Sequence, residues 1–155
     1  MWLLLGAASL VAALVAVGGR HVERRYLAGR YAHDPTELGQ AFNWARSVRH
    51  QRIAVAGTPD QYPFYGVDLS NHVDYMGVKG PHGEFSAFRS CRDFKQALAR
   101  GRYRYVVAFP EVKATPEQPP EAQWTRTDPS AQEVFRAGRA SVFRLDGPVT
   151  VDGCR

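Results

Sequence analysis

Apolar residues run unbroken through the start of the chain and alternate with polar residues after it. Residues 1–19, MWLLLGAASLVAALVAVGG, carry no charge, and Ser9 is the one clearly polar side chain among them. A helix of this length covers roughly 27 Å, close to the thickness of the hydrocarbon core of a bilayer. We therefore predict a retained transmembrane helix. A cleaved signal peptide is the alternative, although it typically begins with basic residues, and none precedes this apolar run.

Beyond the apolar run, helix-like and strand-like patterns follow one another. Apolar residues recur at helical spacing from Leu38 to Val48 and from Cys91 to Leu98, which predicts two amphipathic helices. Four short, mainly apolar runs predict strands: 52–56, 73–78, 103–109 and 140–145. A further short helix is predicted over residues 130–137. Five prolines between residues 110 and 129 argue against regular structure over most of that stretch.

Particular residues mark the ends of the two amphipathic helices. Asp34 precedes the first helix with Glu37 three residues later, which is the spacing of a capping box. Ser90 stands at the start of the second helix. Gly101 follows that helix, at a position where a residue in the left-handed conformation often ends a helix.

Strands that alternate with helices indicate a layered α/β fold. We predict a small Rossmann-like open sheet of three to four mostly parallel strands with flanking helices, preceded by the N-terminal transmembrane helix. Residues 1–31 would form that helix and a basic juxtamembrane extension, and residues 32–155 would form a soluble α/β domain. The total of 155 residues is enough for one domain with a hydrophobic core.

The formal net charge of +5 is concentrated after the apolar run. Residues 20–52 contain seven arginines and three acidic residues, a net of +4, whereas the 13 basic and 12 acidic residues beyond Arg52 leave +1. Basic residues beside a membrane attract anionic lipid, so the lipid bilayer is a predicted partner. Nucleic acid is not, because the one basic stretch on the domain, residues 89–104, is typical of a solvated helix face.

The common sites for nucleotides, metals and nucleophilic catalysis are not indicated. Gly57 follows the first strand without a glycine-rich phosphate loop, and the five histidines show no paired ligand spacing, so neither a cofactor nor a metal is predicted. Ser70, His72 and Asp74 alternate along one extended segment and cannot bond in series as a catalytic triad. No catalytic residue is predicted.

Cys91 and Cys154 are the only two cysteines. In a reducing compartment, Cys91 would be a core residue of the second helix and Cys154 a free thiol in the tail. In an oxidising compartment the two could join, and closing a loop of that length would stabilise the fold by roughly 4 kcal/mol. Two cysteines alone do not decide between these states.

The segment 62–71, YPFYGVDLSN, is the main candidate for ligand binding. It follows the first strand, and open α/β sheets bind ligands in the crevice at the carboxyl ends of their strands. Aromatic rings beside carboxylate and amide groups suit sugars, which offer both apolar faces and hydroxyl groups. The predicted binding residues are therefore Tyr62, Tyr65, Asp68 and Asn71. The competing interpretation is a turn whose polar side chains bond only the backbone.

Three longer stretches follow one another in the chain: RIAVAGTPDQYPFYGVDLSNHVDYMGV, CRDFKQALARGRYRYVVAF and DPSAQEVFRAGRASVFRLDG. Together they resemble the C-terminal part of GT-C integral-membrane glycosyltransferases, relatives of the protein O-mannosyltransferases and other polyprenyl-phosphate-sugar transferases. The matching features are the aromatic-Pro-aromatic-Tyr-Gly turn, the Asp-Leu-Ser-Asn segment, and the Tyr-Val-Val and Val-Phe-Arg-Leu strands. The resemblance covers roughly residues 44–147 with a preceding transmembrane helix, and it includes no catalytic signature.

The resemblance implies an extracytoplasmic α/β domain that helps to shape the acceptor site of a polyprenyl-phosphate-sugar-dependent glycosyltransferase and is not catalytic alone. In that family the catalytic acidic residues lie in the first extracytoplasmic loop of a many-helix membrane domain, so none is carried over to this chain. The implied partners are that catalytic membrane domain and a glycan or lipid-linked sugar. The chain would be the tail of a longer gene product or a split subunit.

The basic residues after the apolar run favour the opposite orientation. Under the positive-inside rule they would place the soluble domain in the cytoplasm. The alternative function is therefore a single-pass, membrane-tethered interaction domain that faces the cytoplasm and is unrelated to glycosyl transfer. A hydrolase that uses Asp68 or Asp74 is a second alternative. The favoured prediction is a single-pass protein of the cell membrane with its soluble domain outside the cytoplasm.

Overall fold

The computed structural model describes residues 36–110 and 117–154, together with residues 19, 21, 22, 25, 26, 29 and 31. The chain divides into two compact units, 1–33 and 34–155. In the first unit the described residues are helical, except that residue 31 lies in a turn. The second unit contains every strand that the structure describes.

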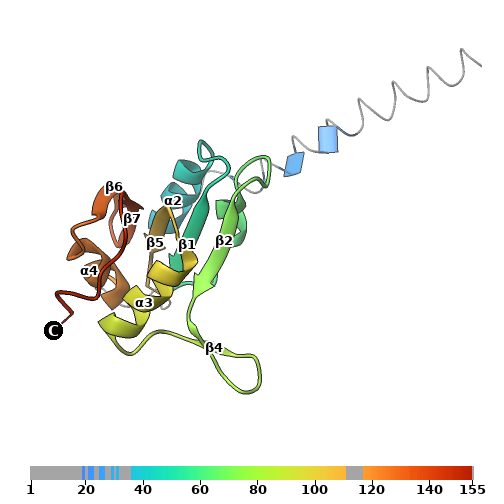
Figure 1. Cartoon of the computed structure of the whole chain (residues 1–155). Helices are drawn as coiled ribbons and strands as arrows, with labels where there is room; N and C mark the ends of the chain where they lie inside the picture. The colour runs from blue at the N-terminus through green and yellow to red at the C-terminus, as the bar shows by residue number, and fades with distance from the viewer. Residues whose placement is uncertain are drawn as a thin grey trace, which may run out of the picture. The chain divides into compact units, whose positions relative to one another are not determined.

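A five-stranded mixed sheet forms the centre of the second unit (Figure 1). In chain order its strands are β1 (Arg52–Ala56), β2 (His72–Met76), β5 (Tyr105–Ala108), β6 (Ala131–Ala137) and β7 (Ala140–Leu145). Their order across the sheet is β2-β1-β5-β7-β6. Strand β1 pairs in parallel with both β2 and β5, whereas β7 is antiparallel to β5 and to β6.

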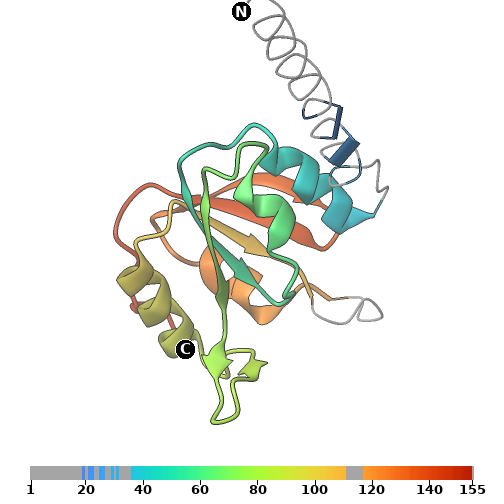
Figure 2. The same ribbon diagram turned by 90° about the vertical axis from the view of Figure 1, so that its right-hand side faces the viewer.

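Helical segments cover both faces of the sheet (Figure 2). Helix α2 (Glu37–Ala45) and the 3-10 helix η1 (Tyr62–Tyr65) lie on one face, and α3 (Cys91–Gly101) and α4 (Pro120–Arg126) lie on the other. Side chains alternate along each strand, so Ile53 and Val55 pack toward α2 while Ala54 and Ala56 pack toward α3 and α4. The second unit is therefore a three-layer α/β domain.

A small antiparallel hairpin extends from the end of β2, away from the main sheet (Figures 1 and 2). It consists of β3 (Val78–Lys79) and β4 (Phe85–Ser86). The ring of Phe85 packs edge-on against Tyr75 of β2, with their centroids 5.7 Å apart. Phe85 is nevertheless 55% exposed, so the hairpin contributes little to the core.

The fold class differs from the prediction in its sheet and in its membrane span. The sheet has five strands rather than three to four, because residues 131–137 form β6 where a short helix is predicted. Two of its four strand pairs are antiparallel, so the sheet is mixed rather than mostly parallel. The proline-rich stretch also contains α4, whose first residue, Pro120, occupies a position where its missing N–H costs no hydrogen bond.

The predicted N-terminal transmembrane helix is not supported. Among the described residues, no helix is both long enough and apolar enough to cross a bilayer. Residues 1–18, which carry most of the apolar run, lie outside the described residues. The structure thus supports a mixed α/β domain, and its described residues include no membrane-spanning helix.

The helix ends confirm the predicted start of α3 at Ser90 and differ from the prediction at two other positions. Ser90 caps α3 by accepting a hydrogen bond from the backbone N–H of Asp93. Helix α3 then ends one residue later than predicted, because Arg102, with a φ of 51°, takes the left-handed position expected for a glycine. Helix α2 is capped by the hydroxyl of Thr36, which accepts from the N–H of Gly39. The predicted cap, Asp34, lies outside the described residues.

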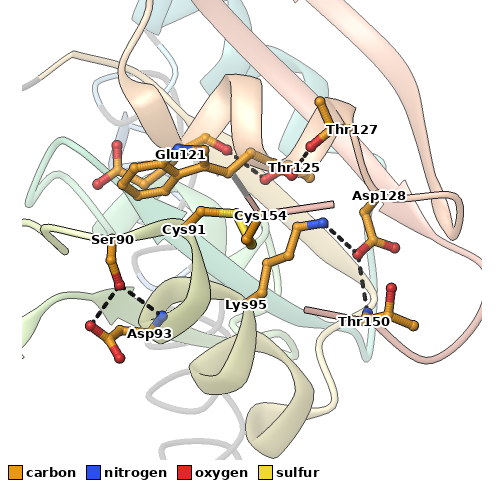
Figure 3. The surroundings of a disulfide bond; sticks show 11 residues. Ser90, Cys91, Asp93, Lys95, Glu121, Thr125, Thr127, Asp128, Thr150 and Cys154 are labelled. Carbon is orange, nitrogen blue, oxygen red and sulfur yellow. Dashed lines mark hydrogen bonds and ion pairs between the residues drawn. A yellow bond between two sulfur atoms is a disulfide. The ribbon is translucent and has the colours of Figure 1, made fainter. Parts of the chain in front are cut away.

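Two buried interactions fix the C-terminal segment against α3 (Figure 3). A disulfide joins Cys91, the first residue of α3, to Cys154, and thereby decides between the two cysteine states left open by the sequence. Nearby, the ammonium group of Lys95 lies 3.0 Å from the carboxylate of Asp128, and both side chains are almost fully buried. The same carboxylate accepts a hydrogen bond from the backbone N–H of Thr150.

Glu121 of α4 is a second buried acidic residue, and it lacks such support. Only 1% of the residue is exposed, and neither carboxylate oxygen has a hydrogen-bond partner among the residues that the structure describes. Burial therefore raises the pKa of the Glu121 carboxyl above its ordinary value. The neutral acid is the form that this position favours.

We predict that loss of the disulfide destabilises the domain by roughly 4 kcal/mol, because the cross-link restricts an unfolded loop that spans 63 residues. Denaturant unfolding of the chain with and without a reductant measures this difference. The double variant Cys91→Ser/Cys154→Ser is the control, and its unfolding midpoint should not respond to reductant. A wild-type midpoint that reductant leaves unchanged would contradict the prediction.

Candidate functional site

The candidate site begins where β1 and β5 end side by side. Both strands run in the same direction, so the residues that follow Ala56 and Ala108 emerge at one edge of the sheet. Gly57 turns the chain there with a φ of +86°, and a Cβ at this position would lie 2.0 Å from the carbonyl oxygen of Phe109. Only glycine permits that close approach without displacing the backbone of the neighbouring strand.

The YPFY sequence forms η1, which places two tyrosines beside this edge. Phe64 is fully buried, and its ring packs edge-on against Phe42 of α2 with a centroid distance of 5.2 Å. Tyr65 is partly buried and donates a hydrogen bond of 3.4 Å from its hydroxyl to the carbonyl oxygen of Val73. Tyr62 is 49% exposed. Phe64 thus anchors η1, Tyr65 packs partly buried against the core, and Tyr62 stays about half exposed.

A cavity of about 820 Å³ lies between the start of α2, η1 and the residues that follow β1 and β5. Its aromatic wall consists of Phe42, Tyr62, Tyr65 and Phe109. Its polar groups include Glu37, Asp60 and Arg139. The volume and the mixture of aromatic and charged groups are typical of a site for a small organic ligand.

Arg139 reaches this cavity from the turn between β6 and β7. Its Nε donates a 2.8 Å hydrogen bond to Oε2 of Glu37, and its guanidinium lies 5.5 Å from the centre of the Phe109 ring. The preceding Gly138, with a φ of +54°, presses against the Glu37 carboxylate so closely that a Cβ would lie 1.9 Å from Oε1. The hairpin turn therefore fixes both charged groups in the cavity wall.

Asp60 supplies a second carboxylate to the same cavity. Its Oδ2 accepts a 3.1 Å hydrogen bond from the hydroxyl of Thr58, which is itself almost fully buried. The cavity thus offers hydrogen-bond acceptors, one guanidinium and flat apolar rings. Polar groups of this kind hold hydroxyl groups, and the rings pack against C–H faces.

The structure places the predicted binding residues in two different settings. Tyr62 and Tyr65 line the cavity, whereas Asp68 and Asn71 are not among its lining residues. Asp68 is exposed and forms a 3.1 Å ion pair with Nε of Arg49. A hydrogen bond from Ser70 lowers the pKa of the Asp68 carboxyl below its ordinary value.

Asn71 is a buried structural residue. Its Oδ1 accepts a hydrogen bond from the N–H of Gln51, and its Nδ2 donates to the carbonyl oxygens of Val48 and Phe64, all at 3.0–3.1 Å. It therefore ties the loop after η1 to the segment before β1. Asn71 therefore behaves as a turn residue whose side chain bonds only the backbone. Tyr62 and Tyr65 lie where a ligand-binding residue is expected.

Sequence reasoning missed Phe42, Phe109 and Arg139 as residues of the site. Phe42 and Phe109 appear in the sequence only as ordinary apolar positions of a helix and a strand. Arg139 follows Gly138 in a stretch that reads as the end of a helix, and the error over residues 130–137 concealed a hairpin turn at that point. The Gly138-Arg139 pair, read as a hairpin turn between two strands, is the sequence signal that identifies Arg139 as a candidate.

Comparisons with known proteins do not add a relative. No family model matches the chain, and neither a curated protein nor a solved structure shows significant similarity to it. Within the part of the chain that the structure describes, no group of three or more histidine, cysteine or acidic residues is arranged to hold a metal ion. The resemblance to GT-C glycosyltransferases therefore stays a prediction based on the residues quoted for it.

We predict that Asn71→Ala lowers the free energy of unfolding by about 3 kcal/mol, because two buried backbone groups and one partly buried group lose their partner at about 1 kcal/mol each. Asp68→Asn is the matched comparison and should leave the unfolding midpoint nearly unchanged, since its ion pair is exposed. Urea unfolding of both variants provides the measurement. A small effect of Asn71→Ala, or an equal effect of Asp68→Asn, would show that the two roles are assigned wrongly.

Proposed function

We propose that the α/β domain is a sugar-binding, non-catalytic part of a polyprenyl-phosphate-sugar-dependent glycosyltransferase system. In this role the cavity at the carboxyl ends of β1 and β5 holds a glycan or lipid-linked sugar near the acceptor site. The catalytic groups belong to a partner membrane domain rather than to this chain. The residues of this chain that bind the sugar are Tyr62, Tyr65, Phe42, Phe109, Glu37, Asp60 and Arg139.

The composition and position of the cavity carry the proposal. Four aromatic residues and three charged side chains share a volume of about 820 Å³, which accommodates one or two sugar rings. Tyr62 is the ring with the largest exposed fraction in that wall, so it offers the most accessible stacking face. The Arg139–Glu37 pair and Asp60 offer donors and acceptors for the hydroxyl groups around the ring.

The disulfide supports a location outside the cytoplasm. Structural disulfides form and persist in oxidising compartments and are rare in the cytoplasm, where thiols are kept reduced. The Cys91–Cys154 bond thus favours the extracytoplasmic proposal over the alternative of a cytoplasm-facing interaction domain. The positive-inside argument for the cytoplasm rests on residues near the start of the chain and is the weaker of the two.

We predict that the full chain binds simple sugars saturably and that Tyr62→Ala weakens this binding about tenfold, or ~1.4 kcal/mol. The measurement is a calorimetric or NMR titration with a panel of methyl glycosides and short glycopeptides. A polyoxyethylene detergent should be used, because sugar-based detergents would compete for the cavity. The purified chain alone should transfer no sugar from a polyprenyl-phosphate donor.

Phe85→Ala is the control for sugar binding, because Phe85 is also an exposed aromatic residue but lies on the β3–β4 hairpin. It should leave the affinity unchanged. Equal losses in the two variants would point to non-specific contact with aromatic surface. The absence of saturable binding across the whole panel would refute the proposed function.

We also predict that Cys91 and Cys154 react with a membrane-impermeant maleimide in intact cells only after treatment with a reductant. An extracytoplasmic disulfide accounts for both conditions, since oxidised sulfurs do not react and the reduced thiols are reachable from outside. Mass spectrometry of the labelled chain reads the result. Labelling that needs no reductant and appears only in lysed cells would support the cytoplasm-facing alternative instead.

A further inference from the structure

A second cavity, of about 550 Å³, lies at the opposite end of the sheet from the sugar site. Its wall includes Arg49, Arg104 and Arg144, which come from three different parts of the chain. Arg49 precedes β1, Arg104 precedes β5, and Arg144 lies in β7 directly opposite Tyr105. The fold therefore brings three arginines to the lining of one hollow, which the sequence does not suggest.

These three arginines form ion pairs with only two carboxylates among the described residues. Asp146 lies 3.0 Å from Nη2 of Arg104 and also accepts hydrogen bonds from Arg144, so one carboxylate serves two guanidinium groups. Arg49 pairs with Asp68 at 3.1 Å. Among the described residues, the three arginines thus pair with two carboxylates, neither of which lines the cavity. The excess charge favours an anionic ligand.

Hydrogen bonds hold the three arginines in place before any ligand arrives. Arg104 donates from Nη1 to the carbonyl oxygen of Leu145 at 2.8 Å, and Arg144 donates from Nη2 to the side chain of Gln132 at 2.6 Å. Arg49 donates from Nη1 to the carbonyl oxygen of Val48 at 2.9 Å. Each guanidinium is therefore oriented, which lowers the entropy cost of binding a ligand.

Each arginine also keeps an N–H group for a ligand. Within the described part of the chain, Nη2 of Arg49, Nε of Arg104 and Nη1 of Arg144 donate no hydrogen bond, although each guanidinium is ion-paired through another nitrogen. Beside them, Trp44 and Tyr105 pack edge-on with centroids 5.1 Å apart and give the cavity an apolar side. The cavity combines cationic donors with a surface that suits an organic substituent.

We propose that this arginine cavity binds the phosphate group of a phosphate ester. A phosphate offers three or more acceptor oxygens, which suit arginines that come from three different segments of the chain, and arginine forms strong, charge-assisted bonds with it. The ester substituent packs against Trp44 and Tyr105. The phosphate comes either from a lipid headgroup or from a soluble phosphate ester. The proposal does not depend on sugar binding at the other end of the sheet.

The first experiment titrates the full chain in polyoxyethylene detergent with inorganic phosphate and follows the arginine Nε–H signals by NMR. Phosphate should shift the signals of Arg49, Arg104 and Arg144 saturably and leave that of Arg92 in place. Arg92 is exposed on α3, away from the cavity. This measurement needs no variant, so it decides the question even where a substitution in the cavity disturbs folding. Shifts that do not saturate, or equal shifts at Arg92, would overturn the proposal.

Variants then separate the site from a general charge effect. Arg144→Gln should weaken phosphate binding about tenfold, and Arg144→Lys should weaken it less because the charge remains while the planar fork is lost. Arg92→Gln removes the same charge elsewhere and should bind phosphate like the wild type. Equal losses in Arg144→Gln and Arg92→Gln would overturn the proposal.

Vesicles distinguish the two sources of phosphate. Partition of the chain onto phosphatidylcholine vesicles is compared with partition onto phosphatidylcholine that contains phosphatidylglycerol. A preference for the phosphatidylglycerol vesicles that Arg144→Gln removes and Arg92→Gln keeps assigns the cavity to a lipid headgroup. Saturable binding of inorganic phosphate without that preference assigns it to a soluble phosphate ester.

Discussion

The burial of β1 on both faces is the constraint on which the rest of the domain depends. Ile53, Ala54, Val55 and Ala56 have no exposed surface, and β1 pairs in parallel with a strand on each side. A strand that is buried in this way requires helices above and below it, and its parallel neighbours require long crossover connections. Those connections collect at the two ends of the strands. Both cavities form there, largely from residues of the connecting segments, and at the amino end also from residues of β5, β6 and β7.

The two ends of the sheet have different chemistry for the same reason. At the carboxyl end of β1, the chain passes through Gly57 into η1, and the aromatic residues of the YPFY segment gather there with the hairpin turn of β6 and β7. At the amino end, the segments that lead into β1 and β5 carry arginines, and β7 ends beside them. The lining at one end thus combines aromatic rings with charged groups, whereas three arginines line the other.

Local patterns in the sequence were sufficient for the elements whose own apolar residues mark them as a strand or a helix. Strand β1, helix α3 with Ser90 at its start, and strand β7 follow from such patterns. Strand β6 does not, because residues such as Ala131, Glu133 and Phe135 are compatible with a helix, and only pairing with β7 makes them a strand. Helix α4 was hidden by prolines that in fact lie at its start.

The candidate site was predictable in part. The two tyrosines were found because they stand together after a predicted strand, and that position survives in the fold. Asn71 shows the limit of this reasoning, since an amide near an aromatic cluster has the same appearance in a sequence whether it binds a ligand or the backbone. Arg139 lies 102 residues from Glu37 in the chain, and no local pattern could have joined them.

The buried carboxyl of Glu121 couples folding to proton binding. Because its pKa in the folded domain is raised above the ordinary value of 4.5, the folded chain holds a proton that the unfolded chain releases over the interval between the two values. The contribution of the protonated Glu121 carboxyl to stability is fully present when the pH is below its pKa in the unfolded chain. That contribution is lost as the pH rises through its higher pKa in the folded domain. Unfolding between these two pH values releases a proton. Glu121 therefore makes the folded domain more stable in a mildly acidic medium than in an alkaline one.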